Sequence, residues 1–420
     1  MPNKKVVIIG GGFGGMNVAK SLANTSYEVT IIDKANHHLF QPLLYQVATA
    51  ALSPGDIATP IRSVFTKQKN VKVVLGEVVE VSKTDQVVQL AEGDVIPFDY
   101  LVIATGAEYN YFGNDDWEKS APGLKSLDDA LRIRERILVS LEQAEKIHDL
   151  EDRKPYLTFV VIGGGPTGVE MAGSIAEIAK RNMMRDYRNF HRNETNVYLV
   201  EAASGVLNGF SESLSDNALE TLTKMGVHVL LNSPVEEIRK DGVQLKNQFI
   251  ETPNIIWAAG VSGTDLTNNL GEETDRIGRI KVNEDLSIPN HPNIFVIGDA
   301  AYFEDEKGKP LAGVAPVAMQ QGKYLGKLLK NESNGTNRKP FKYVDKGTMA
   351  TIGRAKAVAD IKGFKLTGFF AWLIWGVIHI FFLIGFRNRF RVFAEWIWHY
   401  ITFKRGVRLI AHKENREVET

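Results

Sequence analysis

The sequence predicts an α/β protein with two similar domains, one inserted in the other, and a helical segment at its C-terminal end. An apolar run followed by a glycine-rich turn occurs at residues 6–15 and again at residues 158–168, which predicts the two domains. An almost uncharged apolar run at 366–386 predicts the last segment. At 420 residues the chain is long enough for two or three domains with cores of their own.

Composition excludes several classes of function. Lysine plus arginine and aspartate plus glutamate both total 50, so no net field would hold nucleic acid. The chain has no cysteine, which excludes disulfides, thiolate metal sites, iron–sulfur clusters and thiol nucleophiles, and no metal site is expected. The first apolar run begins at Val6, which leaves no room for a signal peptide and predicts residence on the cytoplasmic side.

The first glycine-rich turn lies between two expected strands. Residues 6–9 read as a strand buried on both faces, a helix is expected over 16–24, and a second strand over 28–32 ends at Asp33. The turn allows the backbone to approach a pyrophosphate, and its glycines are Gly10, Gly12 and Gly15, with Gly14 between them. The Asp33 carboxylate can accept a hydrogen bond from a ribose hydroxyl. This unit predicts a Rossmann-like dinucleotide-binding domain.

The second turn repeats the pattern. A strand over 158–162 precedes the turn, a helix is expected over 169–179, and a strand over 196–200 ends at Glu201. The turn contains Gly163, Gly165 and Gly168. The spacing to Glu201 exceeds the usual distance of about 20 residues, so segment 181–194 is expected to extend the helix and its loop. An acid here favours NADH over NADPH because it would repel a 2′-phosphate; the alternative is a solvated acid at a strand end.

Two such sites in one chain favour hydride transfer between nicotinamide and flavin. Their order, the A-T-G segment ending at 106, its counterpart at 255–260 and the segment 293–300 resemble the two-dinucleotide-binding flavoprotein superfamily. The resemblance implies that the first site holds FAD and the second NADH. It also implies FAD contacts from Asp33, Lys34, Val79, Thr105, Gly106, Asp299 and Ala315.

The electron acceptor is predicted from further resemblances. Superfamily members that reduce disulfides, peroxides or sulfide need cysteines, which this chain lacks. Segment 36–49 resembles the flavin-lining segment of type II NADH:quinone oxidoreductases, which implies that Gln46 contacts the flavin ring and a quinone tunnel. His37 and His38, in the same segment, are interpreted as ordinary loop residues.

Segment 315–322 is similar to that family's quinone motif A-Q-x-A-x-Q. The match implies that Ala315 and Gln320 lie near the quinone. Pro316 replaces a glutamine of the motif, so a hydrogen bond from that side chain is not expected. The same residues also fit a helix N-terminus with proline in its first turn.

Glu170 follows the second glycine turn, where the positive end of a helix dipole favours a carboxylate and would alone explain the residue. Type II enzymes have a glutamate at the matching position. The resemblance implies that Glu170 positions NADH or handles a quinone proton.

The C-terminal region has the composition of a membrane-binding segment. The basic segment 387–391 follows the apolar run directly, an aromatic stretch covers 392–403, and tryptophans stand at 372, 375, 396 and 398. Aromatic rings beside arginine and lysine are typical of the lipid headgroup region. We expect monotopic attachment through two helices at the cytoplasmic face of a bacterial inner membrane. A transmembrane span at 366–386 and a buried soluble helix are the alternatives.

The expected organisation is an FAD domain at 1–120 and 270–345, an NADH domain at 121–269 and a membrane-anchoring domain at 346–420. The expected activity is electron transfer from NADH through FAD to a membrane quinone without proton pumping, because no multi-helix proton path is predicted. One alternative is a reductase of a small electron-transfer protein, and another is a redox-responsive interaction protein resembling apoptosis-inducing factor. Homodimers are common in the resembled family.

Overall fold

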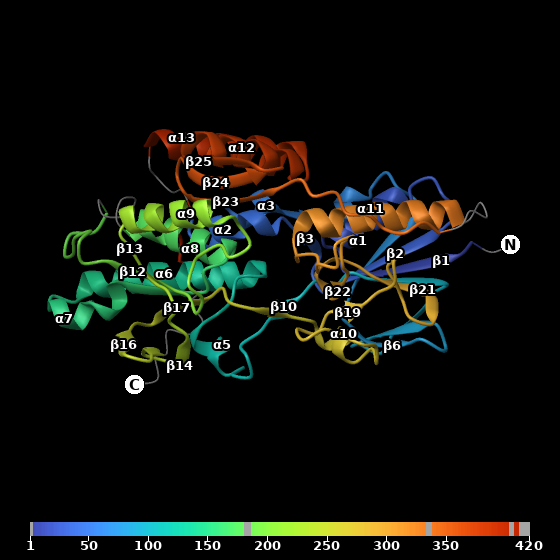
Figure 1. Cartoon of the computed structure of the whole chain (residues 1–420), viewed down its shortest axis with the longest axis horizontal. Helices are drawn as coiled ribbons and strands as arrows, with labels where there is room; N and C mark the ends of the chain where they lie inside the picture. The colour runs from blue at the N-terminus through green and yellow to red at the C-terminus, as the bar shows by residue number, and fades with distance from the viewer. Residues whose placement is uncertain (1–2, 180–185, 333–337, 403–406, 411–420) are drawn as a thin grey trace. The chain divides into compact units, whose positions relative to one another are not determined.

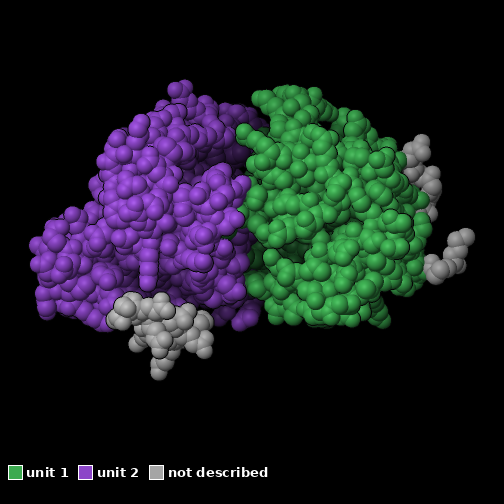
Figure 2. Space-filling model, turned by 90° about the horizontal axis from the view of Figure 1, so that it is seen from below, with its two compact units in different colours: residues 1–39, 58–109, 261–346 green, residues 40–57, 110–260, 347–420 purple. Residues whose placement is uncertain are grey.

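The computed structural model describes residues 3–179, 186–332, 338–402 and 407–410. The chain divides into two compact units, drawn in green and purple in Figure 2. Unit 1 consists of residues 1–39, 58–109 and 261–346, and unit 2 of residues 40–57, 110–260 and 347–420. Residues 181–185 of the expected helix extension, and 403–406 and 411–420 of the C-terminal segment, lie outside the described residues.

Unit 1 is built on a six-stranded sheet in the order β20-β21-β9-β1-β2-β5, parallel except for β20. The strands are β1 (Lys5–Ile9), β2 (Glu28–Asp33), β5 (Val71–Leu75), β9 (Tyr100–Ile103), β20 (Ser287–Ile288) and β21 (His291–Val296). The central strands are buried on both faces, as their continuous β-branched runs predict.

The two faces of this sheet are covered differently (Figure 1). Helices α1 (Phe13–Ser21) and α11 (Ala315–Glu332) cover one face and pack on each other closely because Gly322 and Gly326 of α11 have no side chains. The other face packs against the antiparallel sheet of β6 (Val78–Ser82), β7 (Val87–Leu90) and β8 (Val95–Pro97).

Shorter elements complete unit 1. They are β3 (His37–Leu39), β4 (Ala58–Pro60), α4 (Ile61–Val64), β10 (Glu108–Tyr109), β18 (Val261–Ser262), α10 (Asp265–Asn268), β19 (Ile280–Lys281), η4 (Gly298–Ala300) and β22 (Ala301–Tyr302). Each of the pairs β3–β4, β10–β18 and β19–β22 forms a small sheet.

Unit 2 repeats the arrangement with a four-stranded parallel sheet in the order β13-β12-β11-β17. The strands are β11 (Thr158–Ile162), β12 (Asn196–Val200), β13 (Val227–Leu230) and β17 (Asn254–Trp257), and the main helices are α6 (Leu127–Lys146), α8 (Pro166–Glu177) and α9 (Glu212–Lys224). Helix α6 begins with a capping box, in which the Ser126 and Asp129 side chains each accept from the other's backbone N–H.

Smaller elements surround this core. They are η1 (Gln41–Leu43), α2 (Leu44–Ala48), α3 (Pro54–Ile57), α5 (Trp117–Ser120), α7 (Leu150–Arg153), η2 (Pro155–Leu157), β14 (Val235–Arg239), β15 (Gly242–Leu245) and β16 (Gln248–Glu251). Strands β14 to β16 form an antiparallel sheet.

The C-terminal part of unit 2 is a three-stranded antiparallel sheet followed by two helices. The elements are β23 (Thr348–Gly353), β24 (Lys356–Ile361), β25 (Phe364–Thr367), α12 (Gly368–Phe382) and α13 (Phe386–Thr402). In Figure 1 this sheet lies between the helix pair and helices α8 and α9. The predicted α/β class and the C-terminal helices are therefore confirmed.

Helix limits differ from the sequence prediction in three places. Helices α1 and α8 begin at Phe13 and Pro166, because the last glycine of each turn is already helical. The apolar run at 366–386 does not form one helix: Leu366 belongs to β25, and Gly385, with φ +90°, separates α12 from α13. The basic residues 387–391 consequently belong to α13.

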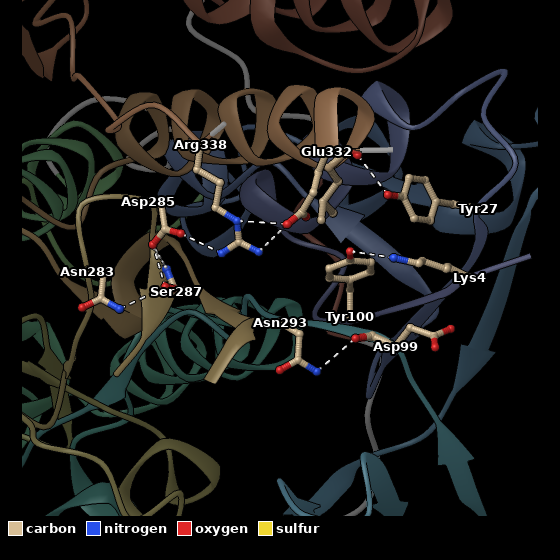
Figure 3. Close-up of polar contacts among 11 residues, drawn as sticks. Lys4, Tyr27, Asp99, Tyr100, Asn283, Asp285, Ser287, Asn293, Glu332 and Arg338 are labelled. Atoms are coloured by element: carbon tan, nitrogen blue, oxygen red, sulfur yellow. Dashed lines mark hydrogen bonds and ion pairs between the residues drawn. The ribbon is translucent and has the colours of Figure 1, made fainter. Parts of the chain in front are cut away.

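An ion-pair network joins the C-terminal end of α11 to the sheet of unit 1 (Figure 3). The Arg338 guanidinium donates to Asp285 at 2.8 Å and to Glu332 at 2.8 Å, and it lies 5.3 Å from the ring of Phe295. Burial alone would raise the pKa of Asp285, but hydrogen bonds from Ser287 and Arg338 outweigh it and hold that pKa below its ordinary value.

We predict that Arg338→Leu lowers the free energy of unfolding by about 1–3 kcal/mol, because two half-buried carboxylates lose their cation. Chemical denaturation measures the loss. Lys342→Leu is the control, since Lys342 and Glu306 form an exposed pair and no loss is expected there. The stabilisation exists above the unfolded pKa of Asp285 and is lost at acidic pH, so the two curves should converge on acidification. Equal stability of Arg338→Leu and wild type at pH 7 would contradict the prediction.

Candidate functional site

The first glycine turn leaves space for a phosphate at the N-terminus of α1. Gly10 has φ +103°, its N–H donates to Ile32 O at 2.8 Å, and a Cβ there would collide with the carbonyl of Ala104. Gly12 is the N-cap of α1, has no side chain to accept from the helix N–H groups, and has open space beside its Cα. The first-turn N–H groups of α1 can therefore bind an anion.

The acid at the end of β2 fixes this turn. Asp33 accepts from the N–H of Gly11 at 2.5 Å with one oxygen and from the N–H of Ala35 at 2.7 Å with the other. Burial raises the pKa of Asp33 above its ordinary value, and the two backbone hydrogen bonds offset only part of that rise. Asp33 thus ties the glycine turn to the end of β2.

A histidine supports the same turn from the other side. His38 Nδ1 donates to Gly11 O at 2.9 Å, and its ring lies edge-on to Phe13 at 5.1 Å. Burial lowers the pKa of His38 to about 4, so the ring is neutral at physiological pH. The sequence alone predicts an ordinary loop residue at His38, whereas the structure gives it a part in holding the turn. No short-range pattern could have identified this role, since the contact joins positions 27 residues apart.

The second turn has the same bonding as the first. Gly163 has φ +109°, and its N–H donates to Val200 O at 2.8 Å. Glu201 accepts from the N–H of Gly164 at 2.5 Å and from the N–H of Ala203 at 2.7 Å, as Asp33 does in unit 1. Gly165 is the uncapped N-cap of α8, and Gly168 stands against the carbonyl of Gly163. The motif that occurs twice in the sequence therefore forms the same pattern of hydrogen bonds in both units.

Other predicted cofactor residues follow strands of the unit 1 sheet. Thr105 and Gly106 follow β9 after Ala104, with Gly106 at φ +77°. Asp299 lies in η4, which follows β21 and Ile297. Ala315 is the first residue of α11, whose first turn contains Pro316 as the composition predicted.

Lys34 and Val79 face solvent. Lys34 forms a 3.6 Å ion pair with Glu108, and both side chains are largely exposed. Val79 is exposed on β6, whereas its neighbour Val78 is buried in the core. Gly14 lies inside α1, where a Cβ would stand 3.0 Å from the Ile297 side chain.

The two neighbouring glutamines of α11 have different surroundings. Gln320 donates to Val344 O and accepts from Val344 N, both at 3.0 Å. Gln321 is buried, and its oxygen accepts from the N–H of Gly298 at 2.7 Å, which fixes the loop that carries Asp299. Sequence reasoning missed Gln321, because only burial distinguishes it from its neighbour.

Unit 2 contains a cavity of about 420 Å³ that is lined by residues of α8, α12, α13, the β23–β24 turn and residues 45–51. One part of its wall is aromatic, with Trp372, Trp375 and Trp396. Another part is polar, with Gln46 and Glu170. The structure thus brings two of the three predicted catalytic residues into one wall, and the third, Gln320, belongs to unit 1.

Glu170 places a carboxyl in this wall. Its Oε1 accepts one long hydrogen bond from the N–H of Thr351, at 3.4 Å. Burial raises the pKa of Glu170 to about 8, and the Thr351 bond offsets little of that rise. Ser174, one turn along α8, donates to Thr49 Oγ1 at 2.9 Å, which fastens α8 to the segment that carries Gln46. Burial therefore favours the protonated form of Glu170 at neutral pH, in which the carboxyl can donate a proton.

The helix pair presents an apolar surface. Large exposed side chains recur along α13 at Phe386, Phe390, Phe393, Ile397 and Ile401, and along α12 at Phe370, Leu373, Val377 and Phe381. In the described parts of the chain, no helix is both long enough and apolar enough to cross a membrane. The alternative of a span at 366–386 is therefore wrong, since α12 is only 15 residues long.

Each unit has a sheet in which a glycine turn follows the central strand and an acid at the end of the neighbouring strand accepts a hydrogen bond from that turn. Two such units define the class of two-dinucleotide-binding oxidoreductases. A family model for pyridine nucleotide-disulphide oxidoreductases matches residues 4–322, and one for the NDH2 C-terminal domain matches residues 346–405. The matches together extend over both units.

Comparison with individual proteins identifies the family more closely. The chain is 44% identical to the type II NADH:quinone oxidoreductase Ndh of Mycobacterium tuberculosis, over 98% of this chain and 91% of that protein. It is equally identical to NdhA of the same organism, over 93% and 86% of the two chains. The solved structure of Plasmodium falciparum NDH2 in complex with NADH has the same fold, with a TM-score of 0.89, 24% identity and coverage of 98% and 100%. The chain belongs to the type II NADH:quinone oxidoreductase family.

We predict that infrared spectra at pH 7 contain a protonated carboxyl band from Glu170 that disappears near pH 8. The same band should be absent from Glu170→Gln. A band that disappears near pH 4.5 would contradict the assignment. Thermal denaturation gives a second test. The unfolded chain ionises Glu170 near pH 4.5, whereas the folded protein keeps the carboxyl protonated up to about pH 8. The folded state of wild type therefore loses stability as pH rises between these two values. Glu170→Gln should therefore gain stability relative to wild type over that range.

Proposed function

We propose that unit 1 holds FAD, that the second glycine turn in unit 2 binds NADH, and that a quinone enters the unit 2 cavity from a lipid surface. The observation that carries the proposal is the cavity itself. A protonated carboxyl and an amide line it, and two helices with exposed apolar faces form part of its wall.

The residues of unit 1 fit FAD. Uncapped N–H groups at the start of α1 suit the pyrophosphate, Asp33 suits the adenosine ribose, and Asp299 suits the ribityl chain or the pyrophosphate. FAD, when bound, accepts hydride from NADH and passes two electrons onward. We therefore assign the FAD domain to residues of unit 1.

Residues 110–260 of unit 2 fit NADH. The N-terminus of α8 suits its pyrophosphate, and Glu201 suits a ribose with free hydroxyls. A 2′-phosphate would lie beside this carboxylate, which supports a preference for NADH over NADPH.

Reduction of the quinone requires a proton in addition to the hydride, since NADH + H⁺ + quinone gives NAD⁺ + hydroquinone. Glu170 holds a proton in the cavity wall at neutral pH. Gln46 supplies an amide to the same wall, 2.8 Å from the Tyr45 hydroxyl. We assign proton donation to Glu170 and quinone binding to Gln46.

The apolar face of α12 and α13 supports attachment to one leaflet of a membrane. The exposed residues of α13 at 386, 390, 393 and 397 recur every three or four positions and so share one side of the helix. Arg387 is exposed in its first turn, where it can contact anionic headgroups. Because NADH is a cytoplasmic metabolite, we place this surface on the cytoplasmic face of the inner membrane.

The proposal is tested by anaerobic stopped-flow absorbance of the flavin. NADH should bleach the oxidised band of the FAD-loaded enzyme, and a short-chain quinone should restore it. Glu201→Gln should slow bleaching by about tenfold at low NADH and leave recovery unchanged. Glu170→Gln should leave bleaching unchanged and slow recovery by about tenfold or more.

Bleaching that a quinone cannot reverse would overturn the quinone assignment and favour a protein acceptor. A loss of both half-reactions in Glu170→Gln, with normal FAD content, would contradict the division of roles. In wild type, recovery should slow as pH rises through about 8, because Glu170 then loses its proton.

Membrane attachment is tested separately by vesicle flotation. The double variant Phe386→Ser with Phe390→Ser should bind anionic vesicles about tenfold more weakly or worse, because two exposed rings no longer enter the lipid. Phe249→Ser is the matched control, since Phe249 is exposed on β16. Equal binding by the double variant and the control would contradict the assignment of the membrane face.

A further inference from the structure

Helix α13 contacts the segment that carries Gln46 through a second, polar side. Trp396 Nε1 donates to Gln46 Oε1 at 2.8 Å, and His399 Nε2 donates to Ala51 O at 2.9 Å. Arg391 lies 3.8 Å from the buried carboxylate of Asp56. These contacts join positions about 350 residues apart, so the helix with the exposed apolar stripe also holds the cavity wall.

The Trp396 contact determines which way the Gln46 amide faces. An indole nitrogen can only donate a hydrogen bond, so the amide atom that it contacts must be the oxygen. The Gln46 nitrogen then faces Tyr45, and it donates to the Tyr45 hydroxyl at 2.8 Å. Rotating the amide by 180° would place its NH₂ group against the indole N–H, where neither group can accept.

A neighbouring tryptophan packs against the Trp396 indole. The rings of Trp375 and Trp396 lie 5.3 Å apart, and Trp375 is buried in α12. Gln46 is itself buried, so without the Trp396 donor its amide oxygen would lose a hydrogen-bond partner.

We propose that Trp396 is a positioning residue for the quinone: it fixes the Gln46 amide so that the second N–H of the amide nitrogen, and not the amide oxygen, is left for a quinone in the cavity. Both oxygens of a quinone accept hydrogen bonds, so the wall must present donors to bind it. This inference rests on the proposed function, because it concerns the quinone in the same cavity. It assigns to α13 a role in quinone affinity besides its lipid contact.

The test is steady-state kinetics of the FAD-loaded enzyme with a short-chain quinone. Trp396→Phe keeps an aromatic ring and removes the N–H, and we expect the quinone KM to rise about tenfold with a small change in kcat. NADH bleaching of the flavin and turnover with ferricyanide, which has no carbonyl to bind, should stay at wild-type values. Trp117→Phe removes an indole N–H elsewhere in unit 2 and should match wild type in every assay.

A double-mutant cycle separates positioning from general damage. Gln46→Met, of similar size but without an amide, should raise the quinone KM at least as much as Trp396→Phe. Adding Trp396→Phe to Gln46→Met should change little further, because the indole acts through the amide. If Trp396→Phe fails to bind FAD, Gln46→Met with Trp396 intact still tests the donor role.

Three outcomes overturn the inference: an unchanged quinone KM in Trp396→Phe, an unchanged quinone KM in Gln46→Met, or effects of the two substitutions that multiply. Failure of the proposed function looks different, because wild type itself would then bleach with NADH and not recover with quinone.

Discussion

The structure depends on a glycine in the left-handed region at the end of the first strand of each dinucleotide-binding sheet. Gly10 and Gly163, at φ +103° and +109°, direct the chain from strand into helix. A side chain on either glycine would collide with the backbone that follows a neighbouring strand, at Ala104 after β9 in unit 1 and at Ala258 after β17 in unit 2. Only glycine permits that approach, and it brings a helix N-terminus to the edge of each sheet. The acids Asp33 and Glu201 then tie the turn to the neighbouring strand.

This constraint explains why so much of the fold could be predicted. A buried strand, a glycine turn and an acid are local in sequence, so their spacing identifies both dinucleotide-binding sheets. Helix limits were less accurate, because Gly15 and Gly168 look like turn residues although each already packs inside its helix against the carbonyl that follows the strand. In the C-terminal segment, composition predicts an apolar surface. It does not predict that the apolar run divides into two helices, because that division depends on the backbone conformation of Gly385.

The parts that could not be predicted depend on contacts between distant positions. His38 and Gln321 support the first nucleotide turn and the loop of Asp299, yet neither belongs to a motif that would distinguish it from its neighbour. The Gln46 segment could be recognised by resemblance, whereas its partner Trp396 is one of several tryptophans in an aromatic stretch. Only the folded chain shows which of those indoles reaches the amide.

Helix α8 connects the two kinds of site in unit 2. Its N-terminus follows the second glycine turn, and one turn further along, Glu170 faces the cavity. Strand β23 passes so close to α8 that its Ile352 carbonyl occupies the place of a side chain on Gly173, and the Thr351 N–H of the same strand donates to Glu170. A larger residue at 173 would push β23 away and lengthen the Thr351 contact to Glu170. The surroundings of Glu170 therefore depend on the close approach of the C-terminal sheet to α8, which the absence of a side chain at Gly173 permits.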